Sequence, residues 1–291
     1  MANCTLCPRQ CGVDRQNTIG FCGVSDKLTL ARAALHHWEE PCISGTGGSG
    51  AIFFSGCSLG CVFCQNHTIS RGKAGQTVTI ERFREICFSL KEQGAENLNL
   101  VTPLHFTPQL LDAILPIKQA LGLTIVCNTG GYDRVETLEM AENLYDCYLP
   151  DFKFASADLA SRYAHAPNYP EIAQKAISEM VRQKGAPQLD ERGMLKSGVV
   201  VRHLILPGSR KDSIAALDIL SDLVGSENVL LSLMSQYTPQ PNAEPPLSRK
   251  ITDFEYKSVL EHALKLGFRG YMQDRTSASE SFTPAFDGTG I

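Results

Sequence analysis

The stretch SGCSLGCVFCQN, residues 55–66, places three cysteines on one short segment directly after the apolar run AIFF. Cys57, Cys61 and Cys64 follow the spacing C-x3-C-x2-C. A structural zinc ion takes four closed, tetrahedral ligands, and only His67, on the same segment, would complete a Cys3His set. Three thiolates on a [4Fe–4S] cluster instead leave one iron open. The motif therefore predicts a cluster whose fourth ligand is a small molecule.

The composition is that of an ordinary globular protein. The 291 residues are 43% hydrophobic and 20% charged, and the net charge is −4. This length suffices for one large domain or two small ones. The slight acidity gives no electrostatic footprint for nucleic acid or a membrane surface, and the sequence shows neither a long apolar run nor a signal-peptide pattern. We therefore expect a cytoplasmic protein with no nucleic-acid or membrane partner.

The eleven cysteines argue for metal binding rather than for disulfides. Secreted disulfide scaffolds are short and cysteine-dense throughout, whereas thiols clustered in a long chain favour metal. Beside the three cysteines already named, a second cluster lies near the N-terminus and consists of Cys4, Cys7, Cys11 and Cys22. The scattered cysteines are expected to be small buried hydrophobes, and they are Cys42, Cys87, Cys127 and Cys147.

The N-terminal cysteines supply four thiolates, enough to close a site without help. The sequence leaves open two alternatives for the metal centre at this site. A structural zinc ion would organise a segment too short to form its own core. An auxiliary [4Fe–4S] cluster would add an electron relay or a substrate ligand. The spacing alone does not separate zinc from iron.

After a loop-rich N-terminal segment that closes in SGTGGSG (44–50), β-rich runs alternate with amphipathic helical runs. We divide the chain into a Cys-rich extension, residues 1–47, and a main domain, residues 48–291. The expected strands are 51–55, 96–101, 123–128, 145–151, 199–206, 228–234 and 268–274. The expected helices are 79–94, 107–122, with a kink at Pro116, 171–185, 212–225 and 253–267.

Six alternations with apolar strands predict an α/β fold with a parallel sheet covered by helices. The periodicity leaves open a doubly wound sheet or a partial (β/α) barrel. In both, ligands bind at the carboxyl ends of the strands. Polar residues do gather after the expected strands, and they are Thr102, His105, Asn128, Thr129, Asp151, Lys153, Gln236 and Tyr237; Arg202 lies within a strand.

At this point the sequence resembles a known family. C-x3-C-x-aromatic-C after the first strand of a β/α alternation is the signature of the radical S-adenosylmethionine (SAM) superfamily, and Phe63 occupies the aromatic position. The resemblance covers roughly residues 48–275. More narrowly, the chain is similar to uncharacterised relatives of pyruvate formate-lyase activating enzyme. The features that suggest this are CTLCPRQCGVDR and GFCGV near the start, DFKF (151–154), RHLILPG (202–208) and SASESFTPAFDGTG near the end.

This resemblance implies a partial (β/α)6 barrel, an incomplete TIM barrel. It also implies that SAM chelates the open iron of the [4Fe–4S] cluster, that one electron cleaves SAM reductively, and that a 5′-deoxyadenosyl radical abstracts hydrogen from a substrate. The expected cofactors are the cluster and SAM, with zinc or a second cluster on the N-terminal cysteines. A flavodoxin- or ferredoxin-type protein is the expected electron donor.

The resemblance further assigns SAM contacts, with departures from the family pattern. VTPLHF (101–106) stands where activating enzymes have a GGE-type stretch that holds the SAM amino group, so its carboxylate is missing. Asn128 replaces an aspartate, which puts a monovalent cation in doubt. The expected SAM contacts are Phe63, Thr102, His105, Asn128, Thr129, Asp151, Lys153, Arg202, Gln236 and Tyr237.

Two residue patterns have competing interpretations. A guanidinium in an apolar strand needs a partner, so Arg202 pairs either with the SAM carboxylate or with an acid of the chain. HHWEEPC (36–42) is interpreted as a connecting segment at the surface that rims the site, because its adjacent histidines lack the i, i+4 spacing of zinc ligands on a helix.

We therefore expect a radical SAM enzyme, oxidoreductase or activase-like, that acts on a small molecule or peptide. One alternative is an activating enzyme for a glycyl radical enzyme, with a protein substrate. Another, of a different class, is a non-catalytic iron–sulfur or zinc scaffold. The missing carboxylate and the extra cysteines favour the first hypothesis over the second. The polar residues at strand ends argue against a scaffold, which has no need of them.

Overall fold

The computed structural model describes residues 3–72, 74–273 and 283–291. Its centre is a sheet whose order is β10-β9-β8-β6-β5-β4-β2-β1-β3. From β2 to β10 every neighbouring pair is parallel. These parallel strands are β2 (Ser49–Phe54), β4 (Asn97–Val101), β5 (Thr124–Thr129), β6 (Cys147–Pro150), β8 (Leu195–Leu204), β9 (Leu230–Met234) and β10 (Arg269–Met272).

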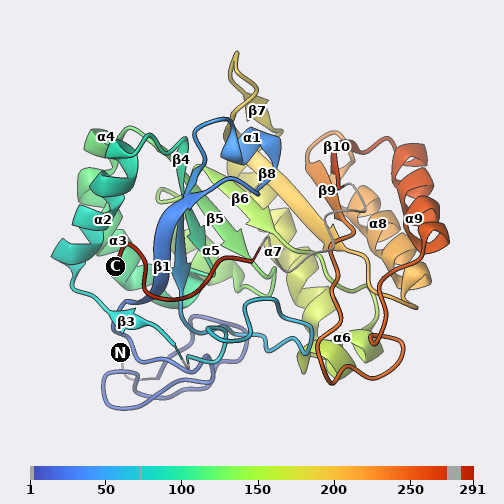
Figure 1. The fold of residues 1–291 in the computed structure, drawn as a ribbon, viewed down its shortest axis with the longest axis horizontal. Helices are drawn as coiled ribbons and strands as arrows, with labels where there is room; N and C mark the ends of the chain where they lie inside the picture. The colour runs from blue at the N-terminus through green and yellow to red at the C-terminus, as the bar shows by residue number, and fades with distance from the viewer. Residues whose placement is uncertain (1–2, 73, 274–282) are drawn as a thin grey trace.

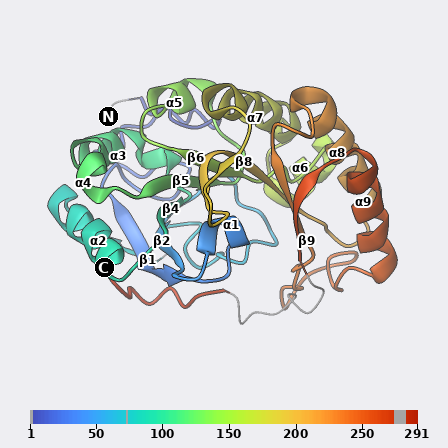
Figure 2. The same cartoon turned by 90° about the horizontal axis from the view of Figure 1, so that it is seen from above.

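The order of the parallel strands decides between the two folds that the sequence left open. A doubly wound sheet reverses its strand order at a switch point. Here the parallel strands lie side by side in chain order, without reversal, as in a (β/α) barrel. Among the described residues the sheet is open, with β10 at one edge and β3 at the other. Figure 2 shows the sheet curving, with helices along its outer side. The predicted partial barrel is confirmed.

The strands are buried and mostly apolar, as expected where helices cover the outer side of the sheet. β4 is an exception, since its buried Asn97 and Asn99 donate hydrogen bonds to Ile43 O and Glu39 Oε1. Every residue of β2, β4 and β6 is buried. The main hydrophobic core joins these strands to the helices, and its largest side chains include Phe54, Phe83 and Phe106. The carboxyl ends of the strands are thereby held at fixed positions.

The principal helices follow the expected positions within a few residues. They are α2 (Ile80–Glu92), α3 (Thr107–Ile114), α7 (Tyr169–Lys184), α8 (Arg210–Val224) and α9 (Asp253–Lys265). Thr79 caps α2, because its hydroxyl accepts a hydrogen bond from Arg82 N. Pro116 does more than kink the expected helix 107–122. That stretch becomes α3, the 3-10 turn η2 (Leu115–Ile117) and α4 (Lys118–Leu121), because proline removes a donor and crowds the preceding turn.

Short elements that the sequence pattern did not predict complete the structure. They are α1 (Pro41–Ser44), η1 (Leu104–Phe106), α5 (Val135–Met140), α6 (Ala157–Ala164), β3 (Gln76–Thr77) and β7 (Gln188–Leu189), the last paired with β8.

The N-terminal segment is less loop-like than expected, because β1 (Thr29–His36) adds an antiparallel strand beside β2. Its sequence, TLARAALH, hides the strand since alanine and leucine favour helices. The C-terminal residues run along β1, and Ala33 N donates to Thr289 O at 2.9 Å. Figure 1 shows this tail crossing β1.

Two sequence predictions reach beyond the described residues. The motif at 277–290 lies partly outside them, as does the last residue of the expected strand 268–274. The division of the chain into an extension, residues 1–47, and a main domain, residues 48–291, stays a prediction.

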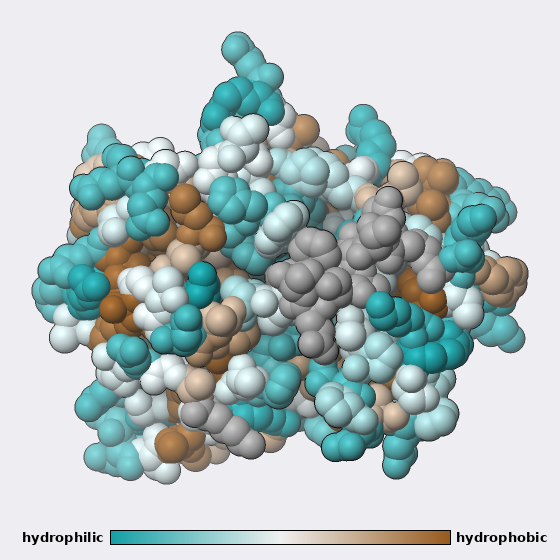
Figure 3. All heavy atoms as spheres, in the orientation of Figure 1, coloured by the Kyte–Doolittle hydropathy of each residue, from teal (hydrophilic) through white to brown (hydrophobic). Residues whose placement is uncertain are grey.

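Hydrophilic and hydrophobic residues are interspersed over the face seen in Figure 3, with hydrophobic residues gathered near α2 and β1. Within residues 3–72, 74–273 and 283–291, no helix has the length and apolar character needed to span a membrane.

Two glycines with positive φ provide a matched test of backbone packing beside the strand ends. A Cβ on Gly131 (φ 77°) would overlap Asp151 O, whereas on Gly122 (φ 61°) it would meet only Gln119 O at 3.9 Å. We expect Gly122→Ala to lower the free energy of unfolding by about 1 kcal/mol, from the left-handed backbone alone. Gly131→Ala should lower it by about 3 kcal/mol. Urea denaturation measures both, and equal losses would contradict the proposed clash.

Candidate active site

A cavity of about 460 Å³ lies at the carboxyl ends of the parallel strands. All three cysteines of the motif line it, together with polar side chains from β5, β8 and the segments that follow β4 and β6. Its wall also includes residues 36–41, which connect β1 to α1. The expected convergence of cysteines and strand-end polar groups is therefore what the structure shows.

The cysteine loop is held by backbone contacts rather than by secondary structure. Cys64 N donates to Cys61 O at 3.2 Å, and Val62 N donates to Tyr163 O at 2.9 Å. Gly60 has a φ of 157°, and a Cβ there would overlap the guanidinium of Arg71. The backbone conformation at Gly60 favours glycine, because side chains with a Cβ rarely adopt this φ, whereas the Arg71 guanidinium is the flexible end of its side chain. The loop therefore keeps its three thiols on the cavity side.

Burial raises the pKa of these thiols, to about 12 for Cys57 and about 11 for Cys64, and neighbouring cysteines add to the effect. Lys153 acts in the opposite direction on all three, Cys61 included. Metal binding needs thiolates, so assembling a cluster here releases protons and leaves negative charge beside Lys153. The donor set therefore fits a [4Fe–4S] cluster, in which each thiolate binds a different iron.

Among the described residues, no three cysteine, histidine, aspartate or glutamate side chains are grouped as ligands of a single metal ion. Neither the cysteines of the loop at 57–64 nor the described N-terminal cysteines form such a group.

Lys153 is fixed next to the cluster loop by the end of β6. Its ammonium donates to Asp151 Oδ2, and its backbone N–H donates to Tyr169 Oη at 2.9 Å. Tyr169 in turn donates to Asp151 O at 2.8 Å. Burial alone would lower the pKa of Lys153, but Asp151 and Cys61 outweigh burial and raise that pKa. A permanent positive charge thus faces the three thiols.

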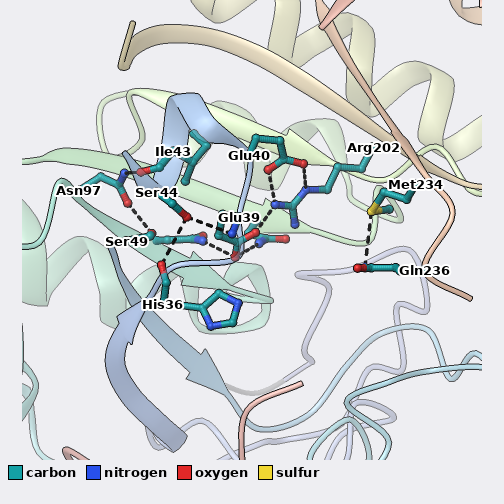
Figure 4. Close-up of polar contacts among 12 residues, drawn as sticks. His36, Glu39, Glu40, Ile43, Ser44, Ser49, Asn97, Arg202, Met234 and Gln236 are labelled. Atoms are coloured by element: carbon teal, nitrogen blue, oxygen red, sulfur yellow. Dashed lines mark hydrogen bonds and ion pairs between the residues drawn. The ribbon is translucent and has the colours of Figure 1, made fainter. Parts of the chain in front are cut away.

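Arg202 is buried in a network with two glutamates from the N-terminal segment (Figure 4). Its Nε donates to Glu40 Oε1 at 2.8 Å and its Nη2 to Glu40 Oε2 at 2.6 Å, a bidentate pair. Nη2 also donates to Glu39 Oε2. Asn99 Nδ2 donates to Glu39 Oε1 at 2.8 Å, and Asn128 Nδ2 approaches it at 3.5 Å. The internal ion pair that the sequence left open is therefore present.

Sequence analysis missed Glu39 and Glu40, because it placed residues 36–42 at the surface. The structure instead buries both carboxylates, with side-chain exposures of 9% and 6%. The short helix α1 begins at Pro41, and Ser44 Oγ accepts a hydrogen bond from Glu39 N at 3.0 Å. One signal was available, since a guanidinium within an apolar strand demands an acid and two adjacent glutamates stood unassigned.

Most of the expected SAM contacts reach the cavity. Thr102, with φ 60°, donates its N–H to Asn128 O at 2.7 Å, which joins the ends of β4 and β5. The predicted residues that line the cavity are Phe63, Thr102, Asn128, Thr129, Asp151, Lys153, Arg202 and Gln236.

His105 and Tyr237 are not part of the cavity lining. His105 lies in η1, where its Nε2 contacts Ser55 O at 2.9 Å and its ring packs on Phe106 at 4.3 Å. Burial lowers the pKa of His105 to about 3, so the ring stays neutral. Tyr237 donates to Leu247 O at 2.5 Å and lines a second cavity. Both residues were expected at the SAM site because they follow strands. Their position in the sequence did not indicate that each ring is buried against the backbone of another segment.

Comparisons with known proteins agree with this geometry. A family model described as a 4Fe-4S single cluster domain matches residues 43–149, which include the cysteine loop. SuiB of Streptococcus suis, in a structure bound to SAM, has a similar fold, with a TM-score of 0.52 and 11% identity over 75% of this chain. The chain therefore has the fold of a SAM-bound structure and, over residues 43–149, is similar to a 4Fe-4S single cluster domain.

Two further similarities concern the fold and the length of the chain. The FeFe-hydrogenase maturase HydG of Carboxydothermus hydrogenoformans has a TM-score of 0.52 and 15% identity, over 80% of this chain and 55% of HydG. The chain covers 48% of SuiB, so it spans about half the length of each structure. An uncharacterised protein of Methanocaldococcus jannaschii is 28% identical over 274 residues, 90% of this chain and 75% of that protein.

The buried network at Arg202 generates a stability prediction. Glu40→Gln removes one charge from a bidentate buried pair, so we expect the free energy of unfolding to fall by about 3 kcal/mol. The exposed pair Glu171–Lys175 is the matched control, with side-chain exposures of 69% and 61%. Glu171→Gln should change stability little, because solvent screens that pair. Urea denaturation compares the two, and similar small effects would contradict a buried network.

Asp133 generates a prediction of pH dependence. It is buried, accepts a hydrogen bond from Thr129 Oγ1 at 2.6 Å, and has its pKa raised from 3.8 to about 7, chiefly by burial. The folded state therefore holds this proton more tightly than the unfolded state. The stability that this confers is present below about pH 4 and is lost as pH rises through 7.

Asp133→Asn should abolish this loss. Between pH 5 and 8, the wild type should lose about 2–3 kcal/mol of unfolding free energy relative to Asp133→Asn. Urea titrations at three pH values measure the difference. If the two proteins show parallel pH profiles, Asp133 is ionised throughout this range in the folded state.

Proposed function

We propose that Cys57, Cys61 and Cys64 bind a [4Fe–4S] cluster and that SAM occupies the remaining cavity, bound to the open iron. The observation that carries this proposal is the single cavity that all three thiols share with charged and amide side chains from successive strand ends. When bound and reduced, the cluster supplies the electron that cleaves SAM to methionine and a 5′-deoxyadenosyl radical, which abstracts hydrogen from the substrate.

The charge of the cavity suits SAM. Its lining holds three carboxylates, Glu39, Glu40 and Asp151, against two cations, Lys153 and Arg202. SAM carries a sulfonium, an ammonium and a carboxylate, so its net charge is positive and complements this lining. Carboxylate groups therefore remain available to the ammonium although no acid follows β4.

We assign complementary roles to the charged groups. Glu39 accepts from the SAM ammonium, because its carboxylate is held by Asn99 and Arg202 and lines the cavity. Lys153, which acts electrostatically on all three cysteines, orients the SAM carboxylate close to the open iron. This places the acid on the N-terminal segment rather than after β4, where the family pattern has it.

Phe63 excludes water from the rear of the cluster loop. Its ring is 7% exposed and packs edge-to-face on Phe154 at 6.1 Å. Radical chemistry needs such a wall, since water or a stray side chain would quench the radical.

We propose a small molecule or a peptide as the substrate. The cavity has the size of a small-molecule site, so SAM would leave room for a small group or an extended segment. Trp38 and Met272 line it while 62% and 57% exposed, respectively, and offer apolar contacts to such a substrate.

The test is anaerobic SAM cleavage. After reconstitution with iron and sulfide and reduction with dithionite, the wild type should form 5′-deoxyadenosine, and Cys57→Ala should abolish its formation because one cluster thiolate is lost. Cys87→Ala is the matched control, since Cys87 is fully buried in α2 away from the cavity. Liquid chromatography quantifies the product.

A reduced protein that forms no 5′-deoxyadenosine needs one further measurement. If SAM changes the electron paramagnetic resonance (EPR) signal of the reduced cluster, SAM binds and cleavage awaits the substrate. An unchanged signal would reject the proposal in favour of a scaffold.

A further inference from the structure

The N-terminal cysteines lie in a loop assembly that backbone hydrogen bonds hold together. Cys4 N donates to Val13 O at 2.9 Å, and Gly12 N donates back to Cys4 O at 3.1 Å. Burial raises the pKa of Cys7 to about 11, and the other three cysteines of the set add to that effect. Cys7 and Cys22 thus each lie close enough to the other cysteines of the set to act on them electrostatically, as ligands of one cluster would.

This assembly is joined directly to the loop that carries Cys57. Cys57 N donates to Cys22 O at 3.1 Å, so one backbone hydrogen bond links a cysteine of each set. Arg9 Nε donates to Ser58 O at 2.9 Å, which adds a second link to the same loop. A Cβ on Gly56 would lie 2.8 Å from Cys22 O, so the close approach requires glycine.

The assembly has an inner and an outer side. Cys4 and Cys22 are each 5% exposed, whereas Cys7 and Cys11 are partly exposed. The inner side thus touches the Cys57 loop, and the outer side reaches solvent. Phe21, next to Cys22 in sequence, is 43% exposed on this assembly.

A buried cation accompanies the four thiols. Arg15 is 1% exposed, and within the described part of the chain its guanidinium donates hydrogen bonds to the carbonyls of His105 and Ser25 rather than to a carboxylate. It acts electrostatically on Cys11 and Cys22. A buried guanidinium needs a counter-charge, and thiolates bound to a metal centre provide one.

We infer that Cys4, Cys7, Cys11 and Cys22 hold a second iron–sulfur cluster that relays electrons to the cluster on Cys57, Cys61 and Cys64. The relay rests on the proposed function. A one-electron donor of the reduced flavodoxin or ferredoxin class reduces the N-terminal cluster from its outer side. That cluster returns to its oxidised state as it reduces the first cluster, so one electron moves through each step and no bond forms or breaks.

Arg15 and the link to Cys57 favour iron over zinc. Zinc has no redox chemistry, so a zinc site gains nothing from direct contact between the two ligand loops. Nearby positive charge stabilises a cluster that gains an electron, and reduction potential follows net charge and hydrogen bonding at the sulfurs.

The first experiment isolates the N-terminal site in the full chain by replacing Cys57, Cys61 and Cys64 with alanine together. After anaerobic reconstitution this variant should retain about four irons per chain and show, once reduced, a cluster EPR signal that SAM does not alter. One zinc and no iron per chain, in this variant and at the N-terminal site of the wild type, would overturn the inference. The result does not depend on SAM cleavage, so it stands apart from a failure of the proposed function.

The second experiment tests the relay itself. Cys7→Ala with Cys11→Ala removes the outer ligands, and freeze-quenched EPR then follows reduction of the first cluster by reduced flavodoxin. Reduction of the first cluster by flavodoxin should slow at least about tenfold. Dithionite, a small molecule, should still reduce the first cluster. Circular dichroism and retained iron at the first cluster confirm folding. Equal flavodoxin rates in the wild type and the variant would overturn the relay.

Arg15→Met supplies a graded variant that keeps all cysteines. Loss of the buried positive charge should lower the reduction potential of the N-terminal cluster. At a fixed donor potential, the ratio of reduced to oxidised cluster should fall about tenfold, which corresponds to about 59 mV for one electron. Arg84→Met is the control, because Arg84 bonds to carbonyls of α3 at the surface. An unchanged ratio in Arg15→Met would contradict the role given to this charge.

Discussion

The ion pair between Arg202 and the glutamates at 39 and 40 is the interaction on which the site depends. It crosses the open barrel, since Arg202 belongs to β8 and its partners precede α1. A guanidinium buried within a strand would be very costly without these carboxylates. The pair therefore fixes the segment after β1 over the strand ends and turns it into a wall of the cavity.

The N-terminal extension consequently serves the site from two directions. Its last part, after β1, contributes carboxylates to the cavity. Its first part lies behind the cysteine loop, where Cys22 O accepts the hydrogen bond from Cys57 N. Neither contact depends on a core of the extension's own, because β1 lies in the same sheet as β2. The barrel and the extension together enclose the cysteine loop.

Local sequence pattern predicted the features that depend on local physics. Apolar runs bounded by caps gave the parallel strands and principal helices, and clustered thiols gave the cysteine loop. The strand β1 escaped because TLARAALH carries no β-branched run, and its pairing with β2 decides its conformation. Glu39 escaped because its partner Arg202 stands 163 residues away along the chain, beyond any local pattern.

His105 and Tyr237 show why position after a strand is an incomplete guide. Both follow strands, yet each ring ends in a backbone hydrogen bond inside the protein, at Ser55 O and Leu247 O, respectively. A strand end fixes where the backbone emerges, not the side to which the next side chains turn. The 3-10 turn η1 directs His105 inward, and such turns leave little trace in sequence periodicity.

Lys153, Arg202 and Arg15, all in the described part of the chain, have different electrostatic partners. Lys153 is paired with Asp151, and Arg202 with two glutamates, so each of these charges is balanced by the chain itself. Arg15 differs, because its bonds go to carbonyl groups and the sulfurs of Cys11 and Cys22 are the charges on which it acts. The guanidinium also lies 5.4 Å from the centroid of the Phe106 ring. Thiolates of the proposed N-terminal cluster would add the full negative charge that carbonyl groups and an aromatic ring do not carry.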